Sequence, residues 1–164
     1  MTVILASAAF WAPVAYRLIG DGGQAETVEG RARYRRLKTS ERRALDRRIR
    51  SSRLTPDVRA GIRKQLDEDA ARFTARERTE IQADLDAEPI TDAEFLAETL
   101  LDWDFRDRAT GQPIPYSAGM LAQMCEDWDG LEAALVRGYT EAQQAALDAR
   151  EIEKNSAAPS GTGS

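Results

Sequence analysis

Two carboxylates, Asp102 and Asp104, lie on either side of Trp103 and come nearest in this chain to a pair for acid–base catalysis. Such catalysis needs two titratable groups that converge on one substrate in a cleft. The spacing supplies no third convergent group, and the surrounding sequence predicts no cleft. We therefore expect these two side chains to end a helix and to accept hydrogen bonds from turn N–H groups.

The residue types that most enzymes and metal sites use are almost missing. The 164-residue chain has no histidine, which is the usual general base, the commonest metal ligand and the usual partner of a nucleophile. Cys125 is the only cysteine, so it can form neither an intramolecular disulfide nor a cysteine metal cluster. Beside Met124, it fits a small buried hydrophobic residue better than a reactive thiol. We predict a protein that is not an enzyme, with no catalytic residue, no cofactor and no metal site.

A hairpin is predicted near the N-terminus. Asp21-Gly22-Gly23 is glycine-rich, but no helix N-terminus follows it, so we predict a tight turn rather than a phosphate loop. The residues on both sides alternate between apolar and polar, as in strands with one buried face. On the second strand, the inner face is expected to hold Val28, Gly30, Ala32 and Tyr34. A two-stranded hairpin must pack on helices or gain strands from another copy.

Helices are predicted after the hairpin. Thr55-Pro56-Asp57 combines an N-cap, a proline at the first helical position and an acid in the first turn, so a helix begins there. Its apolar stripe is expected to consist of Val58, Ile62, Leu66 and Phe73. The opposite face is heavily charged.

A capping box formed by Thr91 and Glu94 starts the next helix. The apolar residues expected on that helix are Phe95, Leu96, Leu100 and Trp103. The run from Asp102 to Ser117 then forms a bridge, in which a glycine permits a reversal and two prolines hold the backbone extended. Ser117 caps a further helix, and Asp129-Gly130 introduces the last one.

The predicted fold is mainly α with a small N-terminal antiparallel β-hairpin and a helical C-terminal bundle, which makes it an α+β protein. The chain divides into a hairpin region, a charged helical segment, a helical region with the Gly/Pro bridge, and a disordered tail rich in Gly and Ser. These four parts are residues 1–38, 39–90, 91–154 and 155–164.

Charge is distributed unevenly along the chain. The stretch from Arg31 to Lys64 is strongly basic and the stretch from Asp67 to Asp104 is strongly acidic, while the net charge is −5. Opposed blocks can neutralise each other within one monomer or between copies. A basic helix can bind phosphates, but this one lacks the interleaved aromatics of a single-strand binder and matches no groove-reading motif. Nucleic acid is therefore not the favoured partner.

The first twenty residues carry no charge until Arg17, but they lack the basic region of a signal peptide and contain Pro13. They are also too short and too rich in small residues to span a bilayer comfortably. We therefore expect neither secretion nor membrane insertion, and a cytoplasmic location.

Six segments, taken in order, resemble the tail assembly chaperones that long-tailed bacteriophages (siphophages) and prophages encode. That family has a Trp-Pro-Val-like segment, an Asp-Gly-Gly turn, an aromatic and basic strand ending in Arg-Leu, a Phe-Leu…Trp segment, a Gly-x-Pro-Ile-Pro-aromatic-Ser bridge and a last helix ending near Lys-Asn. The matching residues are Phe10 to Val14, Asp21 to Gly23, Arg33 to Leu37, Phe95-Leu96 with Trp103, Gly111 to Ser117, and Lys154-Asn155. The chain departs from the family in Ala12, which interrupts the Trp-Pro pair, and in a longer charged stretch at residues 52–87.

The resemblance implies a non-catalytic chaperone of virion assembly that binds the tape measure protein and promotes polymerisation of the tail tube protein. It implies a place in the bacterial host cytoplasm and absence from the mature virion. Two alternatives stay open: a structural tail or connector component retained in the virion, and a small nucleic-acid-binding regulatory protein that uses residues 31–53. Self-association through the opposed charge blocks is a further expectation.

Large aromatic and arginine side chains are the candidates for partner contacts, because these types are enriched at interfaces. Aromatic residues are also common in cores, so both interpretations stay open for them. The candidates are Trp103, Tyr116, Trp128, Tyr139, Arg35, Arg36 and Arg43.

Overall fold

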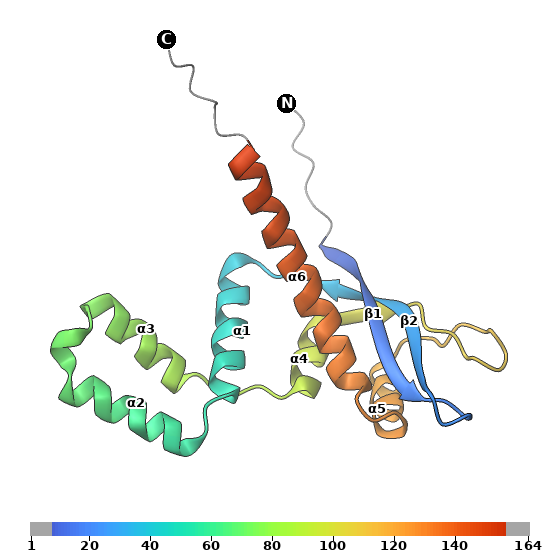
Figure 1. The fold of residues 1–164 in the computed structure, drawn as a ribbon, viewed down its shortest axis with the longest axis horizontal. Coiled ribbons are helices and arrows are strands. Elements are labelled where there is room, and N and C mark those ends of the chain that lie inside the picture. Colours follow the sequence, from blue (N-terminus) through green and yellow to red (C-terminus); the bar gives the residue numbers. More distant parts are fainter. Residues whose placement is uncertain (1–7, 157–164) are drawn as a thin grey trace, which may run out of the picture. The chain divides into compact units, whose positions relative to one another are not determined.

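The structure is a computed structural model that describes residues 8–156, with side chains up to residue 154. It confirms an α+β protein that is mainly helical (Figure 1). The predicted disordered tail, 155–164, lies outside the described residues except for its first two, which belong to the last helix. The elements are β1 (Ala9–Ile19), β2 (Ala25–Arg35), α1 (Thr39–Ser52), α2 (Pro56–Glu68), the 3₁₀ turn η1 (Ala70–Arg72), α3 (Ala75–Asp86), α4 (Asp92–Thr99), β3 (Leu100–Trp103), α5 (Ala118–Asp127) and α6 (Leu131–Ser156).

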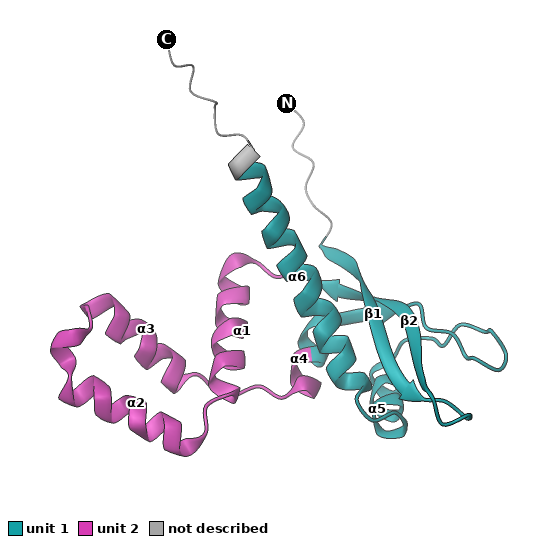
Figure 2. Cartoon of the chain, viewed as in Figure 1, with its two compact units in different colours: residues 1–36, 96–164 teal, residues 37–95 magenta. Residues whose placement is uncertain are grey.

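The chain forms two compact units (Figure 2). Unit 1 combines the chain up to Arg36 with the chain from Leu96 onward, and unit 2 consists of Leu37–Phe95. The hairpin region and the C-terminal helical region, which are separate in sequence, therefore fold together. The charged segment between them forms a unit of its own.

The predicted hairpin is present as two eleven-residue antiparallel strands, β1 and β2. The chain reverses between Gly20 and Gln24, where the N–H of Gly20 donates to the Gln24 carbonyl at 2.9 Å. Gly23 has a φ of 76°, a left-handed conformation that favours glycine. The inner face is as predicted for Ala32 and Tyr34, which are fully buried, whereas Val28 near the turn is 40% exposed.

The third strand of the sheet was not predicted. The helix expected to carry Leu100 and Trp103 ends at Thr99, and the chain continues as β3, antiparallel to β2. A register shift between Arg33 and Tyr34 places two residues three positions apart, Leu100 and Trp103, on the buried side. A spacing of three is also that of a helix face, so the sequence pattern alone favoured the wrong element.

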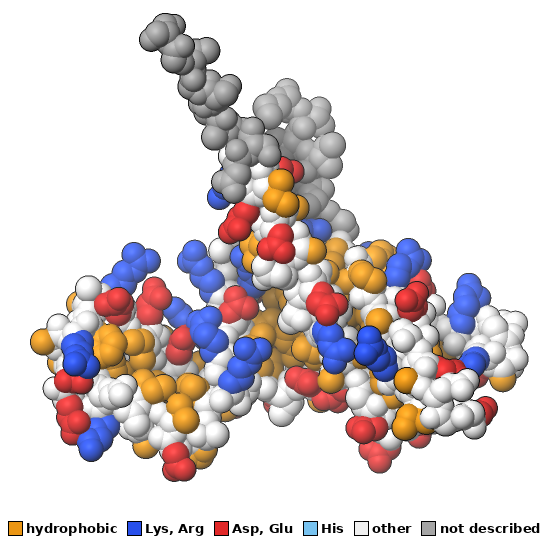
Figure 3. Space-filling model, in the orientation of Figure 1, with side chains coloured by type: hydrophobic (Ala, Val, Ile, Leu, Met, Phe, Trp, Pro, Cys, Tyr) orange, Lys and Arg blue, Asp and Glu red, His pale blue; other side chains and the backbone are white. Residues whose placement is uncertain are grey.

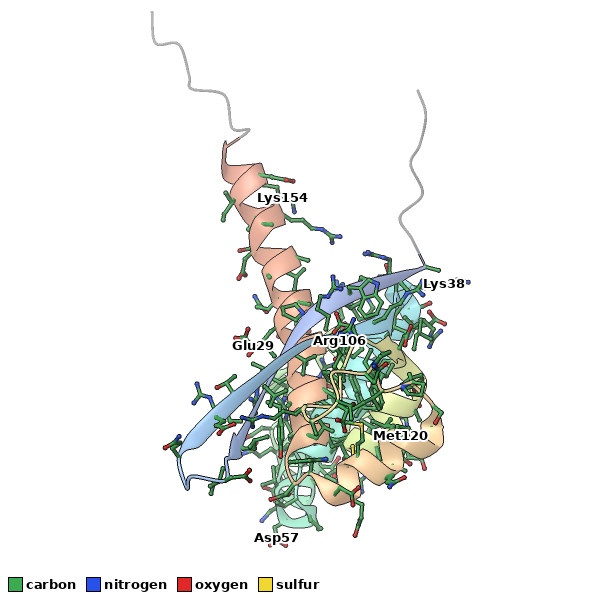
Figure 4. All side chains as sticks on the ribbon, turned by 90° about the vertical axis from the view of Figure 1, so that its right-hand side faces the viewer. Glu29, Lys38, Asp57, Arg106, Met120 and Lys154 are labelled. Carbon is green, nitrogen blue, oxygen red and sulfur yellow. The ribbon has the colours of Figure 1, made fainter. Side chains whose placement is uncertain are left out.

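Helix α6 packs along one face of the long strands of unit 1 (Figures 1 and 4). The Tyr34 hydroxyl donates to the carbonyl oxygen of Leu135 in α6 at 2.6 Å. The Tyr34 ring lies 5.7 Å from that of Phe10 and 5.4 Å from that of Tyr139, between ring centroids. Gly138 permits this approach, because a Cβ there would lie 3.3 Å from the Tyr34 hydroxyl and 3.0 Å from a strand carbonyl oxygen.

The bridge after β3 is an ordered loop that folds back on the strand. The Trp103 indole donates to the carbonyl oxygen of Ile114 at 2.7 Å, and the Tyr116 hydroxyl donates to that of Leu100 at 3.2 Å. The Trp103 ring contacts that of Tyr116 edge-on, at 4.9 Å between centroids. At the tip, Gly111 has a φ of 69°. The loop therefore packs on residues of β3 and leads into α5, whose N-cap is Ser117 as predicted.

In unit 2, α1 packs against α3, and an arginine of α2 ties their ends together. Ser51 is fully buried and donates from its hydroxyl to the carbonyl oxygen of Ala87 at 2.6 Å. The Arg59 guanidinium donates to the Ser51 hydroxyl at 2.7 Å, to the Ser51 carbonyl at 2.8 Å and to the carbonyl of Leu85. Arg59 thus satisfies helix-end carbonyls of both α1 and α3.

The single apolar stripe predicted from Val58 to Phe73 is wrong beyond α2. That helix ends at Glu68, and Phe73 has an extended backbone after η1. The missed signal is a second capping box: the Thr74 N–H donates to Glu77 Oε2 at 2.8 Å, and the Glu77 N–H to Thr74 Oγ1 at 3.2 Å. The predicted capping box at residues 91–94 is confirmed.

The two charge blocks meet inside unit 2. Arg50 donates two hydrogen bonds of 2.9 Å to the Asp84 carboxylate, and Arg47 lies 3.7 Å from the same group. Arg63 lies 3.5 Å from Asp86. For these residues, the charges neutralise each other within one monomer. Exposed pairs of this kind contribute about 0–1 kcal/mol each, so they orient the helices more than they stabilise them.

Two helical glycines should respond in opposite directions to alanine. Gly138→Ala places a Cβ 2.9 Å from Val14 Cγ2 and should destabilise unit 1 by about 1–3 kcal/mol. Gly119→Ala, whose Cβ meets nothing nearer than 4.0 Å, should leave stability unchanged or raise it by up to about 1 kcal/mol. All three tryptophans lie in unit 1, so urea unfolding followed by tryptophan fluorescence reports on it. Equal effects of the two substitutions would contradict the close packing at Gly138.

Candidate functional site

The face of the sheet opposite α6 carries exposed aromatic and basic side chains. Successive side chains of a strand point to opposite faces, so Trp11 lies opposite the buried Ala12. Trp11 is 44% exposed, although large aromatic residues are usually covered. Arg31 and Arg33 of β2 lie beside it, and Arg17 lies farther along β1 on the same face. We call this surface the open face and define it by Trp11, Arg17, Arg31 and Arg33.

An arginine holds the tryptophan of the open face in place. The guanidinium carbon of Arg31 lies 5.4 Å from the centroid of the Trp11 ring, within cation–π range. The Arg31 Nε donates to Asp104 Oδ2 at 2.7 Å, and its backbone N–H donates to Asp104 Oδ1 at 2.6 Å. Asp104, just after β3, therefore fixes Arg31, and Arg31 in turn holds the exposed Trp11 ring in place.

Arg33 and Arg17 extend the positive charge of the open face. Arg33 pairs with Trp11 on β1 and with Asp102 on β3, and Arg17 pairs with Thr27. Within the described part of the chain, neither arginine side chain has an ion pair. A flat apolar ring with guanidinium groups beside it suits an apolar side chain flanked by carboxylates.

The predicted contact residues do not form one surface. Trp103 and Tyr139 are each 5% exposed and belong to the core of unit 1, and Tyr116 is half-buried in the bridge. Trp128 is 47% exposed, at the end of α5.

The three predicted arginines have different surroundings. Arg35 donates from Nε to the carbonyl oxygen of Glu98 at 3.2 Å, Arg36 lies 5.6 Å from the Phe10 ring centroid, and Arg43 is exposed on α1 in unit 2.

Trp11, the exposed tryptophan of the open face, was not among the predicted contact residues. The signal was available in its position: Trp11 is one residue from Ala12 and three from Val14, both of which are buried. The alternation therefore places Trp11 on the outer face of β1, where no core function explains it. Pro13 has no backbone N–H to donate, but it does not disturb this pattern, because β1 is an edge strand and edge strands tolerate proline.

The two carboxylates that were considered for acid–base catalysis have structural hydrogen-bond partners, and the one thiol is partly buried. Asp104 binds Arg31, and Asp102 Oδ1 accepts the N–H of Trp103 at 2.8 Å. Both lie at a strand and its extension, not at the helix end that was predicted. Burial, followed by the nearby charge of Glu132, raises the pKa of the Cys125 thiol, which disfavours the reactive thiolate. In the described residues, no three His, Cys, Asp or Glu side chains lie close enough to hold a metal ion.

The helices of the described region offer no segment that is both long and apolar enough to cross a membrane. Comparisons of the chain with protein-family models, curated proteins and solved structures give no match. The open face is therefore interpreted from its own chemistry.

The contact between Asp104 and Arg31 should make stability depend on pH. Partial burial raises the pKa of Asp104, but the hydrogen bonds and charge of Arg31 outweigh it and leave the pKa below its usual 3.8. A carboxyl with a lowered folded-state pKa stabilises at neutral pH, and this stabilisation is lost as pH falls through the folded value. Asp104→Asn should therefore be less stable than the wild type at pH 7, and the gap should close in strong acid.

Urea unfolding at a series of pH values measures that gap. The control is the same comparison in an Arg31→Gln background, where the gap at pH 7 should be smaller, because the side-chain hydrogen bond and the charge are removed while the backbone N–H of residue 31 still donates to Asp104. A gap that stays constant from neutral to strongly acidic pH would contradict the assignment to this ion pair.

Proposed function

We propose that the protein is a non-catalytic tail assembly chaperone of a long-tailed phage or prophage, which binds the tape measure protein and promotes tail tube polymerisation. The open face of unit 1 is the binding surface in this proposal. Its partner is a helical segment that presents an apolar side chain between carboxylates. Binding through one sheet face requires no catalytic group.

The observation that carries the proposal is the exposed Trp11 held by Arg31 on a sheet covered on its other face. Exposed aromatic anchors beside arginine are typical of binding hot spots. The segments that resemble the chaperone family also support it. Except for Leu37 and Phe95 at the unit boundaries, their residues all belong to unit 1, so the likeness coincides with the unit that carries the open face.

The tape measure protein is a long helical chain, and its exposed apolar faces would aggregate unless another protein binds them before the tail tube encloses it. Many copies of a small charged protein can provide that cover. Each copy contributes one apolar anchor, and its charged surroundings keep the complex in solution. A weak contact per copy is sufficient, because many contacts along one chain add up.

Co-expression with the tape measure protein of the same phage or prophage, followed by co-purification, tests the proposal. Wild-type protein should co-purify, and Trp11→Ser should reduce the recovered complex by about tenfold or more, as for a hot-spot residue. Trp128→Ser is the matched control, because Trp128 is similarly exposed but lies at the end of α5. Both variants should keep the helical circular dichroism of the wild type.

The co-purification results test the proposed function and the proposed binding surface separately. Failure of the wild type to co-purify would contradict the proposed function. Loss of binding in Trp128→Ser with retention in Trp11→Ser would keep the function and contradict the open face as its site.

Mass spectrometry of purified phage particles distinguishes the chaperone from a structural tail component. A chaperone leaves before the particle is complete, so its peptides should be missing while those of tail tube and tape measure proteins are abundant. Peptides of this chain at a fixed ratio to a tail protein would instead indicate a retained component.

A further inference from the structure

Helix α2 in unit 2 has an apolar stripe that its own unit covers only in part, since Ile62 and Leu66 are half-buried and Val58 is exposed. No residue of α2 is buried, although Val58, Ile62 and Leu66 recur every four positions along one side. Val58 is 48% exposed. An amphipathic helix normally buries such a stripe fully, so the exposed part of this one has room for a further packing partner. Figure 3 shows apolar side chains of unit 2 exposed around the hollow between α2 and α3, among charged groups.

The stripe is symmetric about the middle of the helix. Ile62 is the central residue of Pro56–Glu68, and Val58 and Leu66 lie four residues before and after it. If a second α2 lies antiparallel across the first, Ile62 faces Ile62 and Val58 faces Leu66. A two-fold interface requires this kind of self-complementary pattern.

Gly61 flanks the stripe near the middle of α2, three residues after Val58. A Cβ at Gly61 would meet no atom within 4 Å, so the fold of the single chain does not require glycine there. Glycine within a helix is destabilising relative to alanine. A neighbouring backbone that approaches closely would explain it, as at helix crossings that use small residues.

The charges at the hollow are complementary between two copies. Asp67 of α2 and Arg78 of α3 both line it, and both are exposed. Across the described side chains, neither of these two groups has an ion pair or a side-chain hydrogen bond. A two-fold axis through Ile62 allows Asp67 of each copy to meet Arg78 of the other, so that two ion pairs form together.

We propose that the α2–α3 face of unit 2 binds a second copy of this chain, with two α2 helices packed antiparallel about Ile62. This role belongs to residues 52–87, the stretch that departs from the chaperone resemblance, and it does not depend on the proposed function. The two copies bury the apolar stripe of α2 between them.

Sedimentation equilibrium of the purified full chain over a range of concentrations tests the proposal without any tail protein. The wild type should be dimeric at micromolar concentration, and Ile62→Asp should raise the dimer dissociation constant at least a hundredfold. Ile152→Asp is the matched control, because Ile152 is 66% exposed but lies on α6 in unit 1. A wild type that stays monomeric at all concentrations overturns the proposal, as does an equal loss in both variants.

A charge exchange tests the geometry. Asp67→Arg and Arg78→Asp should each weaken the dimer about tenfold or more, because each places like charges together twice across the axis. The double variant restores opposite charges and should return the dissociation constant to near the wild-type value. Additive loss in the double variant overturns the proposed pairing.

Gly61→Ala should have opposite effects on the stability of the monomer and on the affinity of the dimer. In the monomer it should raise the thermal stability of unit 2, since the added Cβ meets open space and alanine favours helix. It should at the same time weaken the dimer, because the helices can no longer approach as closely. Stabilisation of both monomer and dimer would overturn the close crossing at Gly61.

Discussion

The contact between Tyr34 and helix α6 is the constraint on which unit 1 depends. Tyr34 is fully buried in the central strand, and its hydroxyl reaches the carbonyl oxygen of Leu135 across a sequence separation of 101 residues. Burial raises the pKa of this hydroxyl well above its usual value, which keeps it a neutral donor. Gly138 provides the room for this approach, and the ring fills the space between Phe10 and Tyr139.

Because Tyr34 draws α6 onto one side of the sheet, the opposite side carries the exposed groups. Trp11 occupies the outward position on β1 beside the buried Ala12, and Arg31 fixes its ring through the ion pair to Asp104. The same alternation thus builds the core and the open face. In unit 2, Arg59 ties α1 to α3, while the apolar stripe of its own helix is only partly covered.

Local signals in the sequence predicted local structure well. The Asp-Gly-Gly turn, the alternating second strand, the Thr91 capping box and the Ser117 N-cap are all present. The errors arose where distant partners decide the outcome. Leu100 and Trp103 fit a helix face by spacing, and only pairing with β2 makes them a strand. The outward position of Trp11, by contrast, follows from the alternation along β1, so it was open to prediction.

Hydroxyl-radical footprinting of the complex with the tape measure protein tests the central claim most directly, because it measures the solvent exposure of individual tryptophans. The account predicts that oxidation of Trp11 falls severalfold in the complex, whereas oxidation of Trp128 stays at the level of the free protein. Unchanged oxidation of Trp11 in a complex that is otherwise intact would contradict binding through the open face.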